Sequence, residues 1–451
     1  MQTPATLPAV SFREAFFVWL KIGFINFGGP AGQIALMHRI LVEEKKWVSE
    51  TRFLHALNYC MLLPGPEAQQ LATYIGWLMH KTLGGLVAGL LFILPGFVLM
   101  TLIAVAYVVW GELDWMQGLL FGLQAATLAI VIEAVIRVGK KALKHRALYA
   151  LAGLAFLAIF ALQVPFPIIV LAAALIGWAG SRYAPQIFLP ASKNGSKNNE
   201  ADEAVPEHAH PSMGWTLRVL FSGVALWGLP VLLLFAVLGA QHVFTQEAVF
   251  FSKMAVVTFG GAYAVLAYMT QQAVERYGWL SPGEMVQGLA LAETTPGPLI
   301  LVLTYVGFLG AYRDPGSLDP LMAGVFGATL STWVTFVPCF LWIFLGAPYI
   351  ERLRGNRALS AALTGITAAV VGVILNLSIW FALHVLFADG PTWSGFGLSV
   401  PVPEWASIRW PALLLGAAAM LALLKFHVNL MWVLAACAAS GLILRYAGLV
   451  V

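Results

Sequence analysis

Two short motifs of glycine and proline, each present twice, are the residues of this chain best suited to hold a ligand. Phe27-Gly28-Gly29 recurs as Phe259-Gly260-Gly261, and Pro64-Gly65-Pro66 recurs as Pro296-Gly297-Pro298. Both motifs interrupt apolar stretches, and an interrupted helix leaves backbone N–H groups without intrahelical partners. A half-helix that begins at such a break offers N–H donors and roughly half a positive charge, which suit a small oxyanion. Close helix packing through small residues is the alternative interpretation of the same motifs.

The two copies of each motif are separated by one offset, since 259 − 27 = 232 and 296 − 64 = 232. The same offset pairs Lys21 with Lys253, Glu43 with Glu275, Trp47 with Trp279 and Ser49 with Ser281. Chance recurrence of Gly and Pro would not keep Lys, Glu and Trp in register over such a length. The chain therefore contains an internal repeat.

Polar side chains near the breaks complete the predicted substrate-binding site. Lys21 and Lys253 each lie seven residues, or two helical turns, before the first glycine, where they attract an anion or instead extend to the lipid headgroups. The remaining residues of the set are Asn26, Gly28, Gly29, Pro64, Gly65, Pro66, Gln70, Thr258, Gly260, Gly261, Thr294, Thr295, Pro296, Gly297 and Pro298. Their amides, hydroxyls and backbone groups offer neutral hydrogen bonds to an oxyanion.

Three further charged residues have separate predicted roles. Glu67 follows one Pro-Gly-Pro break, and Glu293 precedes the other by three residues. An intramembrane carboxylate carries a coupling proton when burial raises its affinity for protons, or pairs with a lysine. Arg39 has no charged partner in the repeat, because Gln271 takes that place, and is a candidate cytoplasmic gate or a membrane anchor.

The composition shows which elements position these residues. Of 451 residues, 60% are hydrophobic and 10% are charged, and the mean hydropathy is +0.83, whereas soluble domains carry about 25% charged residues. A soluble enzyme is excluded, because so few charges cannot cover its surface. Stretches of about 20 apolar residues predict membrane spans at 83–109, 116–137, 216–239, 320–346, 360–386 and 428–448, with shorter helices at 147–162, 167–181 and 410–424.

The segments that carry the motifs are too short to cross a membrane. The arms 12–27 and 30–42 flank the first glycine pair, and the break at 64–66 divides segment 53–79. These arms form re-entrant hairpins or broken helices, and the basic residues between 38 and 52 favour hairpins that open inside.

Loop charges orient the two halves. Loop 111–114 is acidic and loop 140–146 is basic, whereas the corresponding loops of the second half have the opposite bias: 348–357 is basic, and 388–409 holds Asp389, Glu404 and only Arg409. Because cytoplasmic loops are rich in Lys and Arg, the halves are predicted to be inverted repeats. The predicted fold is an all-α polytopic membrane protein whose broken helices meet near the midplane. Its domains are 1–181, a hydrophilic cytoplasmic linker at 182–214, and 215–451 with one extra N-terminal helix.

Other classes of function lack their motifs. The sequence has no GxxxxGK[ST] phosphate loop, HExxH, GxSxG or His/Cys cluster, so neither an enzyme nor a cofactor or metal site is predicted. Cys60, Cys339 and Cys437 lie far apart in apolar stretches and are predicted to be core thiols. The net charge, 25 − 21 = +4, is too small and scattered to indicate nucleic acid.

The motifs FGGPAGQIALMHRILVEEKKWVS at 27–49 and LLPGPEAQQLATYIGW at 62–77, with the later FGGAYAVLAY and TTPGP, resemble the chromate ion transporter family. The resemblance covers nearly the whole chain and matches the long, two-domain form. It implies a multi-pass protein of the cell inner membrane that exports chromate, a tetrahedral dianion, and so confers chromate resistance. The same resemblance places Phe27, Arg39, Trp47, Glu67 and Gln70 in the family's first-domain motifs.

The sequence leaves several alternatives to a chromate exporter open. Sulfate or another oxyanion has similar charge and size, and sulfate is the expected competitor. A passive anion channel would need no coupling carboxylate. A receptor or scaffold without flux has no evident need for charges inside membrane segments. The proton is the candidate coupling ion, and a homo-oligomer is compatible with the sequence.

Overall fold

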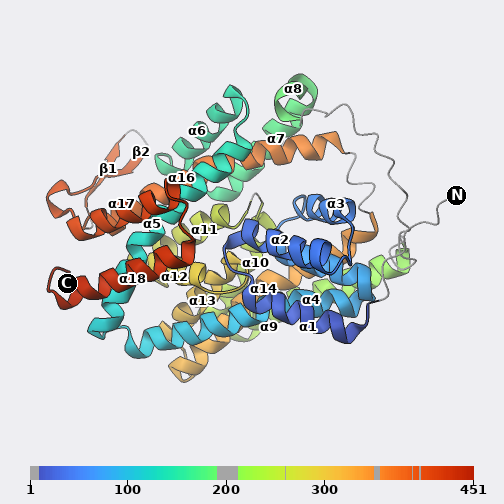
Figure 1. Ribbon diagram of the computed structural model, residues 1–451, viewed down its shortest axis with the longest axis horizontal. Coiled ribbons are helices and arrows are strands. Elements are labelled where there is room, and N and C mark those ends of the chain that lie inside the picture. Colours follow the sequence, from blue (N-terminus) through green and yellow to red (C-terminus); the bar gives the residue numbers. More distant parts are fainter. Residues whose placement is uncertain are drawn as a thin grey trace.

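The computed structural model describes residues 10–189, 212–259, 261–349, 356–388, 390–395 and 398–450, and these are almost entirely helical (Figure 1). The elements of the first half are α1 (Phe12–Ile25), α2 (Gly29–His38), η1 (Arg39–Glu44), α3 (Glu50–Cys60), α4 (Glu67–Trp110), α5 (Asp114–Ala142), α6 (Arg146–Phe160), α7 (Phe166–Tyr183) and α8 (Pro185–Phe188). The elements of the second half are α9 (Met213–Leu238), α10 (Val243–Val257), α11 (Ala262–Thr270), η3 (Gln271–Arg276), α12 (Pro282–Thr294), η4 (Leu299–Leu301), α13 (Val302–Arg313), α14 (Pro320–Gly346), η5 (Ala347–Tyr349), α16 (Arg357–Leu386), β1 (Thr392–Gly395), β2 (Leu398–Pro401), η6 (Trp405–Ser407), α17 (Trp410–Leu424) and α18 (Leu430–Tyr446).

Within these ranges, six helices are long and apolar enough to cross a membrane: α4, α5, α7, α9, α14 with η5, and α16. Five of them contain or match spans predicted from hydropathy. The sixth, α7, was expected as a shorter piece at 167–181, whereas the expected span 428–448 is the 17-residue helix α18. The protein is therefore a multi-pass membrane protein. An antiparallel pair, β1 and β2, stands in the loop 388–409, where no strand was expected.

Helix α4 consists of two antiparallel helices joined by a sharp reversal. The backbone leaves the helical region at His80 and Lys81, and Lys81 has a φ of 55°. A Cβ on Gly76 would lie 2.5 Å from the carbonyl oxygen of Gly84, so the two arms touch through their glycines. The expected division between segment 53–79 and span 83–109 is thus confirmed.

The internal repeat is visible in local backbone structure. The two π-helices, η1 at Arg39–Glu44 and η3 at Gln271–Arg276, are separated by the offset of 232 residues. The loops that follow also match: the N–H of Trp47 donates to Leu41 across 2.8 Å, and the N–H of Trp279 donates to Ala273 across 2.8 Å. The repeat found in the sequence is therefore also a repeat of local backbone structure.

The half-helices around the breaks form hairpins. Lys45, just after η1, reaches back to Glu14 at the start of α1, with its Nζ 2.9 Å from Oε1. In the second half, Arg313 at the end of α13 pairs with Glu284 in the first turn of α12. In each of these two hairpins, the start of the first arm therefore lies beside the end of the second arm, and the break lies at the opposite tip. Figure 1 shows α10 to α13 in the middle of the molecule, with α1 to α3 on one side.

Candidate functional site

The tips of the hairpins meet at a small cavity of about 20 Å³. The cavity is lined by Pro30, Gln33, Gly65, Pro66, Glu67, Ala68, Gly261, Ala262, Pro298 and Leu299. These residues come from all four breaks predicted from the sequence. A cavity of this size holds about one water molecule, so this conformation is too tight for a tetrahedral dianion.

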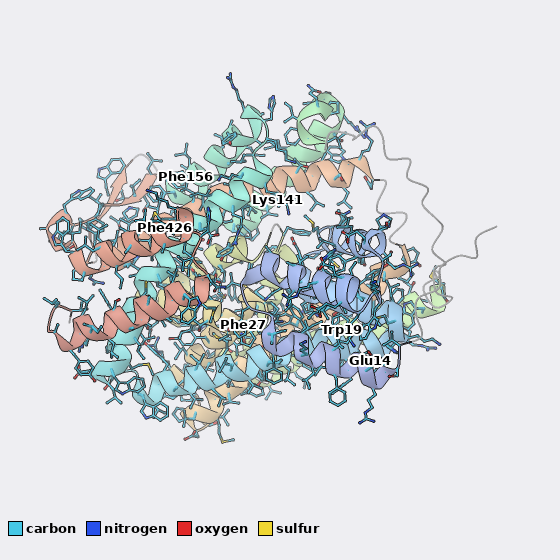
Figure 2. The ribbon with its side chains drawn as sticks, in the orientation of Figure 1. Glu14, Trp19, Phe27, Lys141, Phe156 and Phe426 are labelled. Carbon is cyan, nitrogen blue, oxygen red and sulfur yellow. The ribbon has the colours of Figure 1, made fainter. Side chains whose placement is uncertain are left out.

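Backbone hydrogen bonds join the breaks of one half to those of the other. The N–H of Gly65 donates to the carbonyl of Thr258 across 2.8 Å, and the N–H of Gly297 donates to the carbonyl of Asn26 across 3.4 Å. Gly65 and Gly297 are equivalent in the repeat, as are Asn26 and Thr258. The N–H of Gly297 also donates to Asn26 Oδ1. Figure 2 labels Phe27, next to Asn26, in the middle of the molecule.

Four half-helices begin at the cavity. They are α2 at Gly29, α4 at Glu67, α11 at Ala262, and η4, which leads into α13, at Leu299. Residues at the start of each of them line the same small space. The first N–H groups of a helix have no carbonyl one turn earlier to bond. Gly29 and Gly261 have φ values of 67° and 101°, and a Cβ on either would meet no atom within 4 Å. Positive backbone potential and open room for an approaching atom thus coincide at these glycines.

Gln33 is a buried residue of the site that the sequence analysis did not select. Its Nε2 donates to the carbonyl of Asn26 across 3.0 Å and also to the carbonyl of Gly297. Its Oε1 is buried without a partner among the described residues. The side chain therefore bridges the breaks of the two halves. Its position four residues after Gly29, one helical turn into α2, is the feature of the sequence that could have identified it.

The two candidate coupling carboxylates lie in different surroundings. Glu67 lines the cavity at the start of α4. Glu293 is buried near the end of α12, and its Oε1 accepts a hydrogen bond of 2.6 Å from the hydroxyl of Tyr263. Tyr263, which the sequence analysis also missed, follows the cavity residue Ala262. Its repeat equivalent is Ala31, so the motif alignment gave no hint of it.

The other predicted polar residues mostly bond to nearby backbone. Gln70 Nε2 donates to the carbonyl of Pro64 across 2.8 Å, which supports the break from within its own half. The hydroxyls of Thr258, Thr294 and Thr295 donate to the carbonyls of Met254, Leu291 and Ala292. Threonine in membrane helices commonly makes such bonds, so these hydroxyls are not directed at a ligand in this conformation.

The three predicted cations lie outside the cavity. Lys21 on α1 and Lys253 on α10 are exposed, and neither lines it. Arg39 is exposed at the start of η1, with its Nε 3.4 Å from Glu44 Oε1. Gly260 and residues 190–211 of the predicted linker lie outside the described residues.

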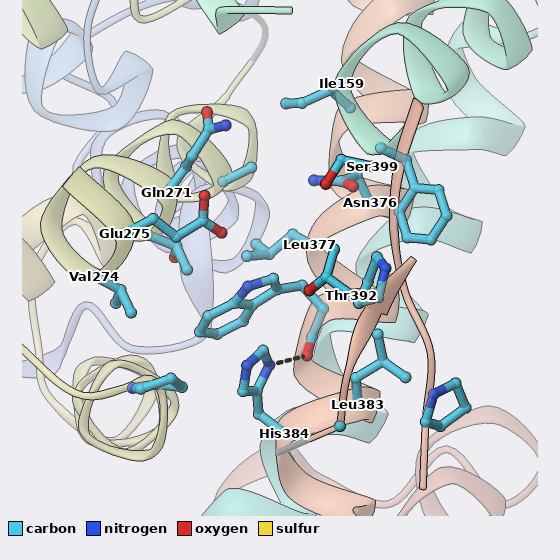
Figure 3. Close-up of a pocket in the computed structure, with 18 of the residues that line it drawn as sticks. Ile159, Gln271, Val274, Glu275, Asn376, Leu377, Leu383, His384, Thr392 and Ser399 are labelled. Carbon is cyan, nitrogen blue, oxygen red and sulfur yellow. Dashed lines mark hydrogen bonds between the residues drawn. The ribbon is translucent and has the colours of Figure 1, made fainter. Parts of the chain in front are cut away.

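A larger cavity, of about 380 Å³, lies away from the breaks (Figure 3). It is bounded by η3, α16 and the β1–β2 pair, and Gln271, Glu275, Asn376 and Trp380 are among its lining residues. His384, also on its wall, bonds through Nδ1 to the carbonyl of Trp380 at 2.8 Å. No residue of the Gly-Gly or Pro-Gly-Pro motifs lines this cavity. The larger cavity is therefore not the one formed by the repeated motifs, although it has the greater volume.

Comparison with known proteins agrees with the motif analysis. A chromate transporter family model matches residues 13–178 and 245–442. The chain is 33% identical over 376 residues to the chromate transport protein of Pseudomonas aeruginosa, covering 82% of this chain and 81% of that one. It is 30% identical over 388 residues to the chromate transport protein of Cupriavidus metallidurans, covering 86% of each chain.

A probable chromate transport protein of Synechococcus elongatus is 28% identical over 404 residues, covering 88% of this chain and 91% of that one. No solved structure matches the chain. The family match covers both halves and includes all four breaks, and the similarity to these relatives is nearly full-length. The chain therefore belongs to the chromate transporter family.

Proposed function

We propose that this protein is a secondary transporter that exports chromate across the inner membrane and so gives chromate resistance. The observation that carries the proposal is the convergence of four half-helix N-termini on one small cavity. Such termini favour an anion without supplying a covalent or metal ligand, which suits a substrate that has to leave again. The names of the relatives in Pseudomonas and Cupriavidus supply the identity of that anion.

The proposed architecture is a pair of inverted repeats, 1–181 and 215–451, joined by the linker 182–214. The equivalent π-helices and the exchanged bonds between the breaks support a twofold relationship between the halves. The hairpins α1–α2 and α3–α4 enter the membrane from the cytoplasmic side, and α10–α11 and α12–α13 enter from the opposite side. Helix α9 is the extra crossing that reverses the second copy. Its side chains are largely exposed, as expected of a helix facing lipid.

Transport proceeds by alternating access around the cavity. Two positions on α2, Ala31 and Ala35, are exposed, whereas their equivalents on α11, Tyr263 and Ala267, are buried. This difference between equivalent faces supports a cycle in which the two hairpins exchange environments. The cavity widens when one hairpin moves away, because in its present form it holds only about one water.

Coupling is assigned to the carboxylates at the site. Glu67 at the cavity wall binds a proton in one phase of the cycle, and Glu293 with Tyr263 is the second candidate. For an inward proton gradient to drive export, the proton moves inward while the anion moves outward. The carboxylate therefore carries its proton in the return half of the cycle and is deprotonated when the anion crosses.

The test is chromate uptake by inverted membrane vesicles, with and without a proton gradient and with excess sulfate. We expect gradient-driven accumulation in the wild type, loss of accumulation in Glu67→Gln, and only partial inhibition by sulfate. Equal gradient-independent equilibration in both proteins would instead show a passive channel. Full competition by sulfate, with sulfate itself accumulated, would show a general oxyanion transporter. Accumulation that persists in Glu67→Gln moves the coupling step to Glu293.

A further inference from the structure

Helix α5 carries a line of charged side chains for which the proposed function gives no role. Glu133, Arg137 and Lys141 recur every four residues and so share one face of the helix. Arg137 Nη1 lies 3.6 Å from Glu133 Oε1, and their side chains are 44% and 31% exposed. Exposed charges on a helix long and apolar enough to span a membrane are unfavourable against lipid, so this face lines water.

Helix α5 lies beside the helix that carries one carboxylate of the candidate site, because Ile130 of α5 and Ala290 of α12, three residues before Glu293, belong to the same buried cluster. Lys141 interacts electrostatically with Glu67, and Arg137 interacts with Glu293 and Tyr263. Helix α5 is held against α12, which carries Glu293, by a hydrogen bond of 3.2 Å from Gln124 Nε2 to the carbonyl of Gly283. Figure 2 labels Lys141, which lies in the last turn of α5.

The cavity itself lacks a cation. Of its ten lining residues, only Glu67 is charged, and it is an acid. Helix N-termini contribute about half a charge each, and their effect fades within a turn. A dianion approaching this cavity therefore passes a carboxylate and benefits from a full positive charge along its path. Among the charged residues that act on Glu67 and Glu293, the cations are Lys141 and Arg137.

We propose that Arg137 and Lys141 form the aqueous approach to the cavity and bind the oxyanion dianion as it enters, with Glu133 as a positioning residue for Arg137. This inference rests on the proposed function. The planar guanidinium of Arg137 can donate two parallel hydrogen bonds to two oxygens of a tetrahedral dianion. Lys141, one turn nearer the helix end, offers a point charge that draws the anion toward Arg137. Both positions lie on a helix outside the four motif hairpins.

The experiment is chromate uptake by inverted vesicles containing Arg137→Gln, Lys141→Gln, Arg137→Lys and the control Lys144→Gln. Lys144 carries the same charge but lies beyond the end of α5 at Ala142. We expect Arg137→Gln to raise KM about tenfold, with kcat changed by less than about threefold. Lys141→Gln raises KM by a smaller factor, Arg137→Lys restores part of the loss, and Lys144→Gln resembles the wild type. The salt dependence of KM becomes shallower in Arg137→Gln.

Two outcomes would overturn the inference: KM unchanged in both Arg137→Gln and Lys141→Gln, or an equal rise in Lys144→Gln. If Arg137→Gln does not reach the membrane, Lys141→Gln decides, because that side chain is exposed in the last turn of α5. Failure of the proposed function looks different, since wild-type vesicles would then accumulate no chromate. If the wild type accumulates chromate and both variants match it, the role proposed for α5 is rejected and the proposed function still stands.

Discussion

The backbone N–H of Gly65 donates to the carbonyl of Thr258 across 2.8 Å, although 258 − 65 = 193 residues separate them along the chain. The equivalent bond runs from Gly297 to Asn26. Each Pro-Gly-Pro break is thus joined to the Gly-Gly break of the opposite half. A broken helix needs partners for its exposed backbone groups inside a membrane, and here each half supplies part of that need for the other.

Substituting Gly65 should disable the site. Gly65 has a φ of 126°, and a Cβ there would lie 2.8 Å from both Gln70 Nε2 and Cys339 Sγ. We expect Gly65→Ala to lower the stability by about 1–3 kcal/mol and to reduce chromate transport strongly. Thermal unfolding in detergent and vesicle uptake measure the two effects. Gly153→Ala is the control, because Gly153 lies in α6 with no atom within 4 Å of an added Cβ.

Removing the bridge made by Gln33 should impair transport more than folding. Gln33→Leu loses both hydrogen bonds to the carbonyls of Asn26 and Gly297, each of which contributes about 1 kcal/mol. The expected result is a drop in kcat/KM of at least about tenfold, measured in vesicles, with the protein still inserted. Gln287→Leu serves as the matched control, because Gln287 is a buried helical glutamine that does not line the cavity. Full activity in Gln33→Leu would argue against a role for this bridge.

The double variant Lys21→Ala/Lys253→Ala should leave the KM for chromate within about threefold of the wild-type value. Both side chains are exposed, and neither lines the cavity, so their positive charges are better placed for lipid headgroups. Uptake kinetics over a range of chromate concentrations provide the measurement. A KM increase of tenfold or more would return the lysines to the substrate path.

Cysteine labelling can test the inverted arrangement of the halves. Lys144→Cys and Arg357→Cys should react with an impermeant thiol reagent from one side of the membrane, and Glu112→Cys and Glu404→Cys from the other. All four positions are exposed, whereas the native Cys60, Cys339 and Cys437 are buried, which keeps background labelling low. Labelling of Lys144→Cys and Arg357→Cys from opposite sides would refute the inverted repeat.

The ion pair at the end of the second hairpin should make stability depend on pH. Burial raises the pKa of Glu284, but hydrogen bonds from Arg313 and the backbone of Ser281 outweigh it and leave the pKa below its ordinary value. The pair therefore stabilises the fold above the ordinary pKa, and the contribution is lost as pH falls through the lower folded value. We expect Glu284→Gln to cost about 1 kcal/mol at pH 7, since Arg313 is 42% exposed.

The difference in stability between Glu284→Gln and the wild type should shrink as the pH falls below the ordinary pKa of a glutamate, about 4.3. Thermal unfolding of both proteins across this range gives the comparison, with Glu112→Gln as the control for loss of an exposed acid. A difference in stability that grows toward low pH would contradict the role given to this pair.

Sequence patterns predicted the elements that depend on local chemistry. Long apolar stretches gave α5, α9, α14 and α16, because their length and composition match a bilayer. The paired motifs located all four breaks, since Gly and Pro interrupt helices for local steric reasons. The reversal of α4 at His80 and Lys81 falls between the expected segments 53–79 and 83–109, whereas the contact between Gly76 and Gly84 that brings its two arms together was not predicted.

The candidate site was predictable only in part. The repeat offset relates Gly65 to Gly297, but it does not say that Gly65 bonds to Thr258 instead of to its own half. Such pairing depends on how the halves approach each other in space. Lys21 and Lys253 illustrate the same limit. Their spacing from the glycines shows which face of the helix they occupy, but not whether that face contacts lipid or the cavity. Gln33 and Tyr263 acquire their roles from partners in other hairpins.

The exchanged bonds also set an order of events during biosynthesis. At about 5–20 residues per second, Thr258 is made roughly 10–40 s after Gly65. Throughout that interval the nascent first half lacks the acceptor that Gly65 uses in the finished protein. The first half is therefore exposed to insertion factors and membrane proteases as an incomplete unit. Two halves produced as separate polypeptides would become long-lived only after meeting in the same bilayer, so their cellular half-life would report directly on their assembly.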